Sequence, residues 1–191
     1  FAGLGASAGD FGDTNFSSNV EDLIAAAGFL REKFGAPQLL VGHSMGGTAV
    51  LAAAHRIPES TAVVTIASPS DPHYVVNALL SEHLDTLAQS GEARVKLAGR
   101  DFNIRQQFVE DAAQHELAER IAHLGRALLV MHAPNDDTVE MANALRIFEM
   151  AQYPKSFISL DGIDHLVTGR DDAAQVAAMI AAWSARYVDA A

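Results

Sequence analysis

Short apolar runs alternate with amphipathic stretches along most of the chain. Three runs, 39–41, 61–67 and 127–131, consist mainly of Leu, Val, Ile and Ala and have the length of buried strands. Strands that are apolar on both sides are typical of a parallel sheet whose two faces are covered. Because stretches of helical period follow these runs, the pattern predicts an α/β fold with a mostly parallel sheet and helices on both faces.

The two clearest helical patterns lie near the ends of the chain. Residues 20–34 place apolar side chains near the 3.6-residue period, and Ser18 is followed by Glu21 in the spacing of a capping box. We therefore expect this helix to begin at Ser18. A second helix should follow the short strand expected at 155–160, with an apolar face formed by Val176, Met179, Ile180 and Trp183.

The segment 73–125 is less regular than the rest. Residues 74–87 and 106–124 favour helix, and the alternation across 93–105, around Gly99 and Arg100, favours a hairpin. The segment lies between two expected core strands. We therefore expect it to form a small cap inserted into one domain that spans residues 1–191.

A glycine-rich turn follows the first apolar run. It reads Gly42-His43-Ser44-Met45-Gly46-Gly47 and leads into an alanine-rich stretch that should be helical. A strand, a Gly-x-Ser-x-Gly turn and a helix in this order form a nucleophile elbow, in which the serine has a strained backbone and its hydroxyl stands above the sheet. Gly42 and Gly46 should leave room where a Cβ would collide. The alternative is a glycine-rich turn with an incidental serine.

Two further candidates follow later strands in the chain. Asp136 comes after the run 127–131, and His165 comes after the strand expected at 155–160. Active residues of an open parallel sheet lie at the carboxyl ends of its strands. Since a serine needs a base, and the base an orienting carboxylate, Ser44, His165 and Asp136 are expected to meet.

These assignments leave alternatives open. Asp137 could replace Asp136 as the acid, and Asp136 could simply close an Asx turn at the start of a helix. His165 could be an ordinary loop histidine. If Ser44 is the nucleophile, the backbone N–H of Met45 should be one oxyanion donor.

Composition narrows the possible partners. The chain has 191 residues, of which 49% are hydrophobic and 19% charged, as in ordinary globular domains. A net charge of −11 argues against a nucleic acid or an anionic membrane as partner. The chain contains no cysteine, which excludes disulfides and thiolate metal sites and is consistent with the cytoplasm. No apolar run approaches the ~20 residues of a membrane span.

Two stretches resemble known binding motifs but lack a residue or a position that each motif requires. Gly3 and Gly5 suggest a dinucleotide-binding loop, but the third glycine, Gly9, comes too late and no strand precedes it. The stretch from His115 to Glu119 begins like a zinc-protease motif but ends in Glu instead of His. We therefore expect no organic cofactor and no metal.

The chain resembles the serine α/β-hydrolases, and more closely the hydrolase half of bacterial proteins in which this domain is fused to an OsmC-like domain. Four segments carry the resemblance: 1–7, 42–47, 132–139 and 161–165. It implies an α/β-hydrolase fold, with Ser44 as nucleophile, Asp136 as acid and His165 as base.

The match to the family is incomplete in two places. The family's acid motif reads His-Gly-x-x-Asp-x-x-Val, and here Ala133 replaces the glycine between His132 and Asp136. The family's second oxyanion donor and its N-terminal strands would precede Phe1. We therefore expect a chain that lacks the N-terminal strands, and a homodimer that covers the open sheet edge.

The sequence thus predicts a serine hydrolase that cleaves short-chain, small-molecule carboxylic esters through an acyl-enzyme. A serine aminopeptidase or a thioesterase would use the same triad. The third possibility is a catalytically impaired fragment that acts as an interaction module.

Overall fold

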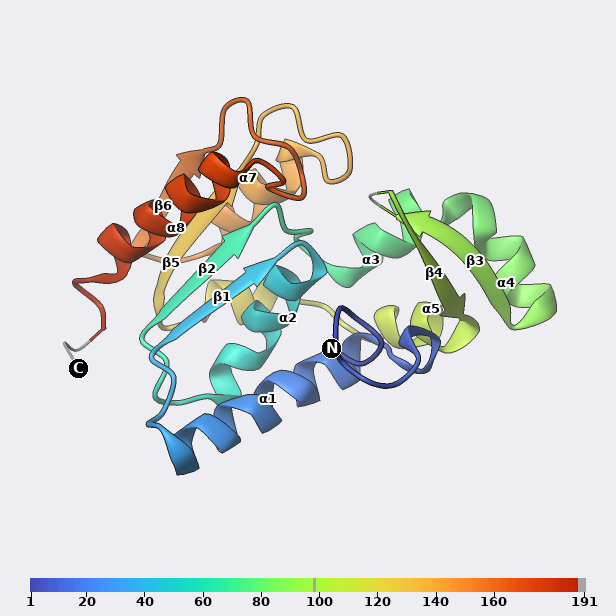
Figure 1. The fold of residues 1–191 in the computed structure, drawn as a ribbon, viewed down its shortest axis with the longest axis horizontal. Helices are drawn as coiled ribbons and strands as arrows, with labels where there is room; N and C mark the ends of the chain where they lie inside the picture. The colour runs from blue at the N-terminus through green and yellow to red at the C-terminus, as the bar shows by residue number, and fades with distance from the viewer. Residues whose placement is uncertain (98, 189–191) are drawn as a thin grey trace.

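A four-stranded parallel sheet forms the centre of the molecule (Figure 1). The computed structural model describes residues 1–97 and 99–188. The strands have the order β1-β2-β5-β6, and every neighbouring pair is parallel. Their bounds are Leu39–His43 for β1, Ala62–Ile66 for β2, Ala127–His132 for β5 and Lys155–Ser159 for β6. The predicted parallel sheet is confirmed.

Successive residues of the central strands enter two different cores. Every residue of β2 and β5 is buried. Because side chains alternate between the faces of a strand, Val63 and Leu128 pack on one side while Val64 and Leu129 pack on the other. The continuous apolar runs in the sequence therefore reflect a sheet that is covered on both sides.

Helices cover both faces, as predicted. Four helices pack on one face: α1 (Phe16–Lys33), α2 (Met45–Ala53), α6 (Ala118–Ala122) and α7 (Met141–Met150). The opposite face is covered by α8 (Arg170–Ser184), which buries Val176 and Ile180 against it. Two short 3₁₀ turns, η1 (Phe11–Asp13) and η2 (Ala54–Arg56), precede α1 and extend α2. None of the helices in the described part of the chain is both long and apolar enough to cross a membrane.

The start of α1 differs from the prediction. Asn15 is the N-cap, and its side chain accepts a hydrogen bond from the Ser18 backbone N–H at 2.8 Å. The Ser18 hydroxyl in turn accepts from the Asn15 N–H at 2.9 Å, so Ser18 is the third residue of the helix. The expected N-cap at Ser18 was wrong because Asn caps a helix as well as Ser does. The earlier start also brings Phe16, which is fully buried, into the helix.

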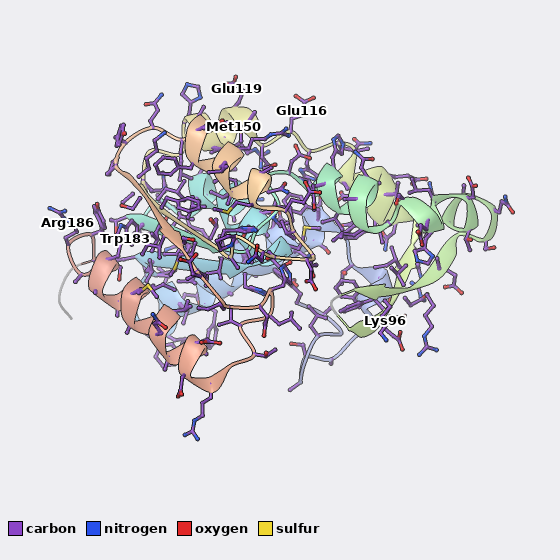
Figure 2. The ribbon with its side chains drawn as sticks, turned by 90° about the horizontal axis from the view of Figure 1, so that it is seen from above. Lys96, Glu116, Glu119, Met150, Trp183 and Arg186 are labelled. Carbon is purple, nitrogen blue, oxygen red and sulfur yellow. The ribbon has the colours of Figure 1, made fainter. Side chains whose placement is uncertain are left out.

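The inserted segment forms a cap beside the sheet, and Lys96 belongs to the hairpin of this cap (Figures 1 and 2). The predicted hairpin is present, but the helix expected over 74–87 is broken into short turns, and the one expected over 106–124 is split in two. The elements of the cap are α3 (Pro72–Tyr74), the π-helical turn η3 (Val75–Leu79), the 3₁₀ turn η4 (Ser81–His83), α4 (Leu84–Ser90), β3 (Glu92–Leu97), β4 (Arg100–Arg105) and α5 (Gln106–Ala112).

The cap has an apolar cluster of its own, which includes Val75, Leu80, Ile104 and Phe108. Met45, at the start of α2, packs against both this cluster and the core under the sheet. The cap therefore reaches the start of α2, next to the candidate serine.

Polar contacts attach the cap to the segment that leads into α1 and to the first turn of α1. Arg105 of β4 pairs with Asp10, at 3.1 Å, and with Asp13. The Ser17 hydroxyl donates to Asp111 of α5 at 2.6 Å, and the Ser17 backbone N–H donates to the same carboxylate at 2.8 Å. These contacts hold the N-terminal segment and the start of α1 against the cap.

Candidate active site

Ser44 occupies the turn between β1 and α2 with a backbone that side-chain-bearing residues rarely adopt. Its φ is 52° and its ψ is −131°. Such a conformation costs about 1–3 kcal/mol and persists only where the surroundings hold it. Here the Ser44 N–H donates to the carbonyl oxygen of Ile66 at 2.8 Å, which fixes the turn against β2. The predicted strained elbow is confirmed.

The glycines of the turn have unequal roles. A Cβ on Gly42 would lie 2.3 Å from the Gly46 carbonyl oxygen, so no side chain fits there, as expected. A Cβ on Gly46 would only contact the Phe1 ring at 3.9 Å, so the prediction for Gly46 was wrong. The second close contact involves Gly47, where a Cβ would lie 1.7 Å from the Ser68 hydroxyl oxygen. Gly46 is free of this constraint because it faces a cavity, whereas Gly47 faces the loop after β2.

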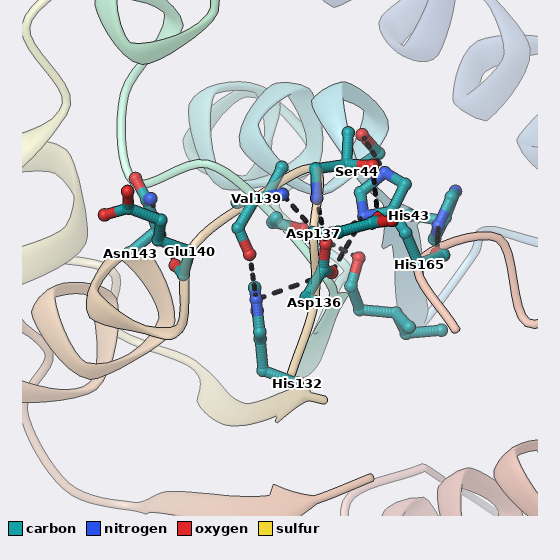
Figure 3. A network of polar contacts seen from close by, with 12 residues as sticks. His43, Ser44, His132, Asp136, Asp137, Val139, Glu140, Asn143 and His165 are labelled. Atoms are coloured by element: carbon teal, nitrogen blue, oxygen red, sulfur yellow. Dashed lines mark hydrogen bonds and ion pairs between the residues drawn. The ribbon is translucent and has the colours of Figure 1, made fainter. Parts of the chain in front are cut away.

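The three predicted side chains form one hydrogen-bonded chain (Figure 3). His165 Nδ1 lies 2.8 Å from Asp136 Oδ2, and His165 Nε2 lies 3.1 Å from Ser44 Oγ. An ionised carboxylate can only accept, so the Nδ1 atom carries the proton and Nε2 is left to accept from the serine hydroxyl. The three residues follow β1, β5 and β6, whose carboxyl ends meet at this edge of the sheet.

Asp136 uses its two carboxylate oxygens for different purposes. Oδ1 accepts from the backbone N–H groups of Thr138, at 2.9 Å, and Val139, at 2.8 Å, while Oδ2 accepts from His165. The Asx turn and the contact with the histidine were weighed as alternatives, and the structure contains both. Asp137 is exposed and contacts Thr138 Oγ1 at 3.1 Å, so it is not the carboxylate that meets His165.

His132 supports the loop that carries Asp136, a role that the sequence reasoning missed. Its side chain is fully buried, and Nε2 donates to the carbonyl oxygen of Val139 at 2.8 Å. The same nitrogen lies 3.6 Å from Asp136 Oδ2. His132 therefore closes the loop over residues 132–139 from below (Figure 3). The sequence signal was the placement of this histidine four residues before the acid, with Val139 three residues after it.

His43 contacts the backbone of the candidate base. Its Nε2 donates to the carbonyl oxygen of His165 at 2.6 Å, and the two rings are 5.2 Å apart. Burial lowers the pKa of His43 below its ordinary value, although the hydrogen bond to His165 opposes this shift. The neutral ring still has one N–H to donate, so His43 fixes the backbone of His165 without adding a charge.

A cavity of about 250 Å³ opens beside Ser44. Its walls come from the N-terminal segment, through Phe1 and Phe11, and from the cap, through Phe102 and Phe108. Met45 also lines the cavity, and it is the first residue of α2. Since N–H groups in the first turn of a helix lack an intrahelical acceptor, the Met45 N–H can donate to a ligand next to Ser44.

Comparison with known proteins agrees with this geometry. A model of the Alpha/beta hydrolase family matches residues 1–190. The crystal structure of the esterase domain of a Rhodothermus marinus protein is 43% identical, with 94% of this chain and 72% of that chain covered and a TM-score of 0.75. No curated protein matches the sequence.

More distant structures share the fold alone. Est1E from Butyrivibrio proteoclasticus, solved with ferulic acid bound, is 15% identical, with 97% of this chain and 74% of that chain covered and a TM-score of 0.77. Mouse alpha/beta hydrolase domain-containing protein 10 is 23% identical, with 98% of this chain and 76% of that chain covered and a TM-score of 0.75. The expected fusion to an OsmC-like domain stays a prediction. With its parallel sheet, its elbow and the matched family model, the chain belongs to the alpha/beta hydrolase family.

Proposed function

We propose that the protein is a serine esterase that cleaves short-chain carboxylic esters through an acyl-enzyme. The observation that carries this proposal is the hydrogen-bonded chain from Asp136 through His165 to Ser44, which ends at the cavity. The similarity to a Rhodothermus marinus protein described as an esterase domain, at 43% identity, supports the same reaction class.

In the first half of the reaction, Ser44 Oγ attacks the ester carbonyl carbon while His165 Nε2 takes the hydroxyl proton. Asp136 stabilises the imidazolium that forms. The carbonyl oxygen becomes an oxyanion, and the Met45 N–H donates to it. A single donor of this kind contributes about 10²–10³ in rate. The tetrahedral intermediate then collapses, the bond to the alcohol oxygen breaks, and His165 returns its proton to the leaving alcohol.

In the second half of the reaction, a water molecule replaces the serine hydroxyl as the nucleophile. His165 takes a proton from the water, the hydroxide attacks the acyl carbon, and the bond to Ser44 Oγ breaks as the proton returns to the serine. The products are a carboxylic acid and an alcohol. No redox step is needed, and the net change is the addition of one water molecule across the ester bond.

The cavity supports a preference for small acyl groups. At about 250 Å³ it lies just below the range of roughly 300–1,000 Å³ that is usual for ligand pockets. Its walls are predominantly apolar, with lining residues such as Leu4 and Val75. A long acyl chain would extend beyond such a cavity, so we expect the rate to fall as the chain lengthens.

The test uses a fluorophosphonate probe together with three substrate classes. We expect covalent labelling of the parent protein, no labelling of Ser44→Ala, and turnover of p-nitrophenyl acetate that exceeds turnover of an acyl-CoA and of a dipeptide amide. Faster turnover of the thioester or the amide would reassign the protein as a thioesterase or an aminopeptidase. If the probe does not label the parent protein, the chain is not a serine hydrolase.

A further inference from the structure

The walls of the cavity are rich in aromatic side chains. Four phenylalanines line it: Phe1, Phe11, Phe102 and Phe108. The rings of Phe11 and Phe102 lie 4.9 Å apart with their planes tilted by 52°. Aromatic rings prefer tilted, edge-to-face or offset neighbours, and such pairs add about 0.5–1.5 kcal/mol beyond the area they bury. A flat ring would therefore bind this cavity better than a flexible aliphatic chain of similar size.

One polar side chain in the wall has an oxygen atom without a hydrogen-bond partner. Asn19 of α1 lines the same cavity and is 2% exposed, and its Oδ1 atom has no hydrogen-bond partner among the described residues. A buried carbonyl oxygen without a partner costs about 1–3 kcal/mol. A ligand group that donates a hydrogen bond to Asn19 would remove this cost. A wholly apolar ligand would leave the Asn19 oxygen without a partner, and the cost would remain.

The aromatic walls and the Asn19 carboxamide together favour a ligand that has both a ring and a hydrogen-bonding group. We propose that the cavity binds a hydroxylated aromatic acyl group, with the ring among the phenylalanines and its hydroxyl hydrogen-bonded to Asn19. A hydroxyl both donates and accepts, so it matches either end of the carboxamide. The acyl group is assigned to the cavity because it stays attached to Ser44 through the acyl-enzyme, whereas the alcohol leaves first. This inference rests on the proposed esterase function.

The test compares matched pairs of methyl esters. One member of each pair carries a 4-hydroxyl on the ring: 4-hydroxyphenylacetate against phenylacetate, and 3-(4-hydroxyphenyl)propanoate against 3-phenylpropanoate. Saturated carbons separate the ring from the ester, so the hydroxyl does not alter the reactivity of the carbonyl. The two spacers sample two depths in the cavity.

We expect the hydroxyl to raise kcat/KM about fivefold in at least one pair, the increase that one hydrogen bond gives. In Asn19→Leu, which removes the carboxamide at nearly constant volume, the ratio within that pair should fall to about one. The ratio is unaffected by the fraction of active enzyme, so partial misfolding of the variant does not change it. The matched control is Asn77→Leu, the same substitution at an exposed position of the cap, which should keep the ratio of the parent.

Binding to Ser44→Ala separates this inference from the esterase proposal. Isothermal titration should show tighter binding of the hydroxylated ester than of its partner, and the added Asn19→Leu change should remove the difference. Equal affinity and equal kcat/KM within both pairs, or a hydroxyl preference that survives in Asn19→Leu, would overturn the assignment of Asn19. Absence of ester turnover and of fluorophosphonate labelling, with the binding difference intact, would overturn the esterase function and leave the ligand class standing.

Discussion

Asp136 Oδ2 and His165 Nδ1 lie 2.8 Å apart, with the two side chains 0% and 5% exposed. They are separated by 29 residues in the chain and meet because β5 and β6 are neighbouring parallel strands. The contact fixes the tautomer of His165 and thereby directs Nε2 toward Ser44.

Asp136→Asn should lower kcat for p-nitrophenyl acetate by about 10⁴-fold, because the amide no longer holds the imidazole in the required tautomer. Asp137→Asn is the matched control, since Asp137 is exposed and one residue away. It should change kcat by no more than about twofold, as exposed substitutions usually do. Equal losses in the two variants would show that the carboxylate partner of His165 has been assigned to the wrong residue.

The buried His132 gives a prediction that combines activity with stability. His132→Leu leaves the Val139 carbonyl without its donor and should cost about 1–3 kcal/mol in the free energy of unfolding. Because the loop then holds Asp136 less firmly, kcat should fall by roughly 10–100-fold with little change in KM. His132→Gln can place an N–H near the position of Nε2 and should recover part of both losses. Full activity of His132→Leu would show that the loop is held without this contact.

Adjacent glycines in the elbow should respond in opposite directions. Gly47→Ala drives a Cβ into the Ser68 hydroxyl and should cost about 3 kcal/mol or more, measured by urea unfolding. Adding Ser68→Gly should recover part of that loss. Gly46→Ala meets only the Phe1 ring at van der Waals distance and should stabilise the fold by about 0.4–1 kcal/mol. Similar destabilisation at both positions would contradict the steric assignment.

His43 should make stability depend on pH on the acidic side of neutrality. Burial lowers the pKa of His43 in the folded state below the ordinary 6.5, so the unfolded chain binds the proton more readily. The stability from this group is complete above pH 6.5 and is lost as the pH falls below it. His43→Gln keeps a donor for His165 but does not titrate. Its Tm should therefore fall less between pH 7 and pH 5 than the Tm of the parent, and identical curves would exclude His43 as the source.

The predicted homodimer should form through the edge strand β1. Its Val41 side chain is 45% exposed, and Phe34 at the end of α1 is 79% exposed. An open edge with apolar neighbours can pair with a second chain. We expect sedimentation analysis to show a dimer for the parent protein and a monomer for Val41→Lys, which places a charge on the edge. A monomeric parent protein would refute the expectation.

Much of the fold was predictable because the deciding interactions are local or periodic. Buried strands such as 127–131 are continuous apolar runs, and α8 carries its apolar face at helical spacing. The proximity of Ser44, Asp136 and His165 could also be predicted, because parallel topology brings the carboxyl ends of strands together.

The remainder depends on contacts between segments that are distant in sequence. The breaks in the helix expected over 74–87 follow from packing within the cap, where Val75 and Leu80 must both reach one cluster. The role proposed for Asn19 could not be predicted from the sequence for the same reason. Its surroundings exist only once α1, the cap and the N-terminal segment have closed around one cavity.

The cap has an apolar cluster apart from the two that hold the sheet, and Met45 packs against both it and one of them. Substitutions at Phe102 or Phe108 can therefore reshape the ligand cavity while the strands that carry Asp136 and His165 keep their packing. These two cavity residues lie on different elements from Asp136 and His165. A library of sequence changes confined to the hairpin and α5 would be a natural starting point for changing the substrate preference of the proposed esterase.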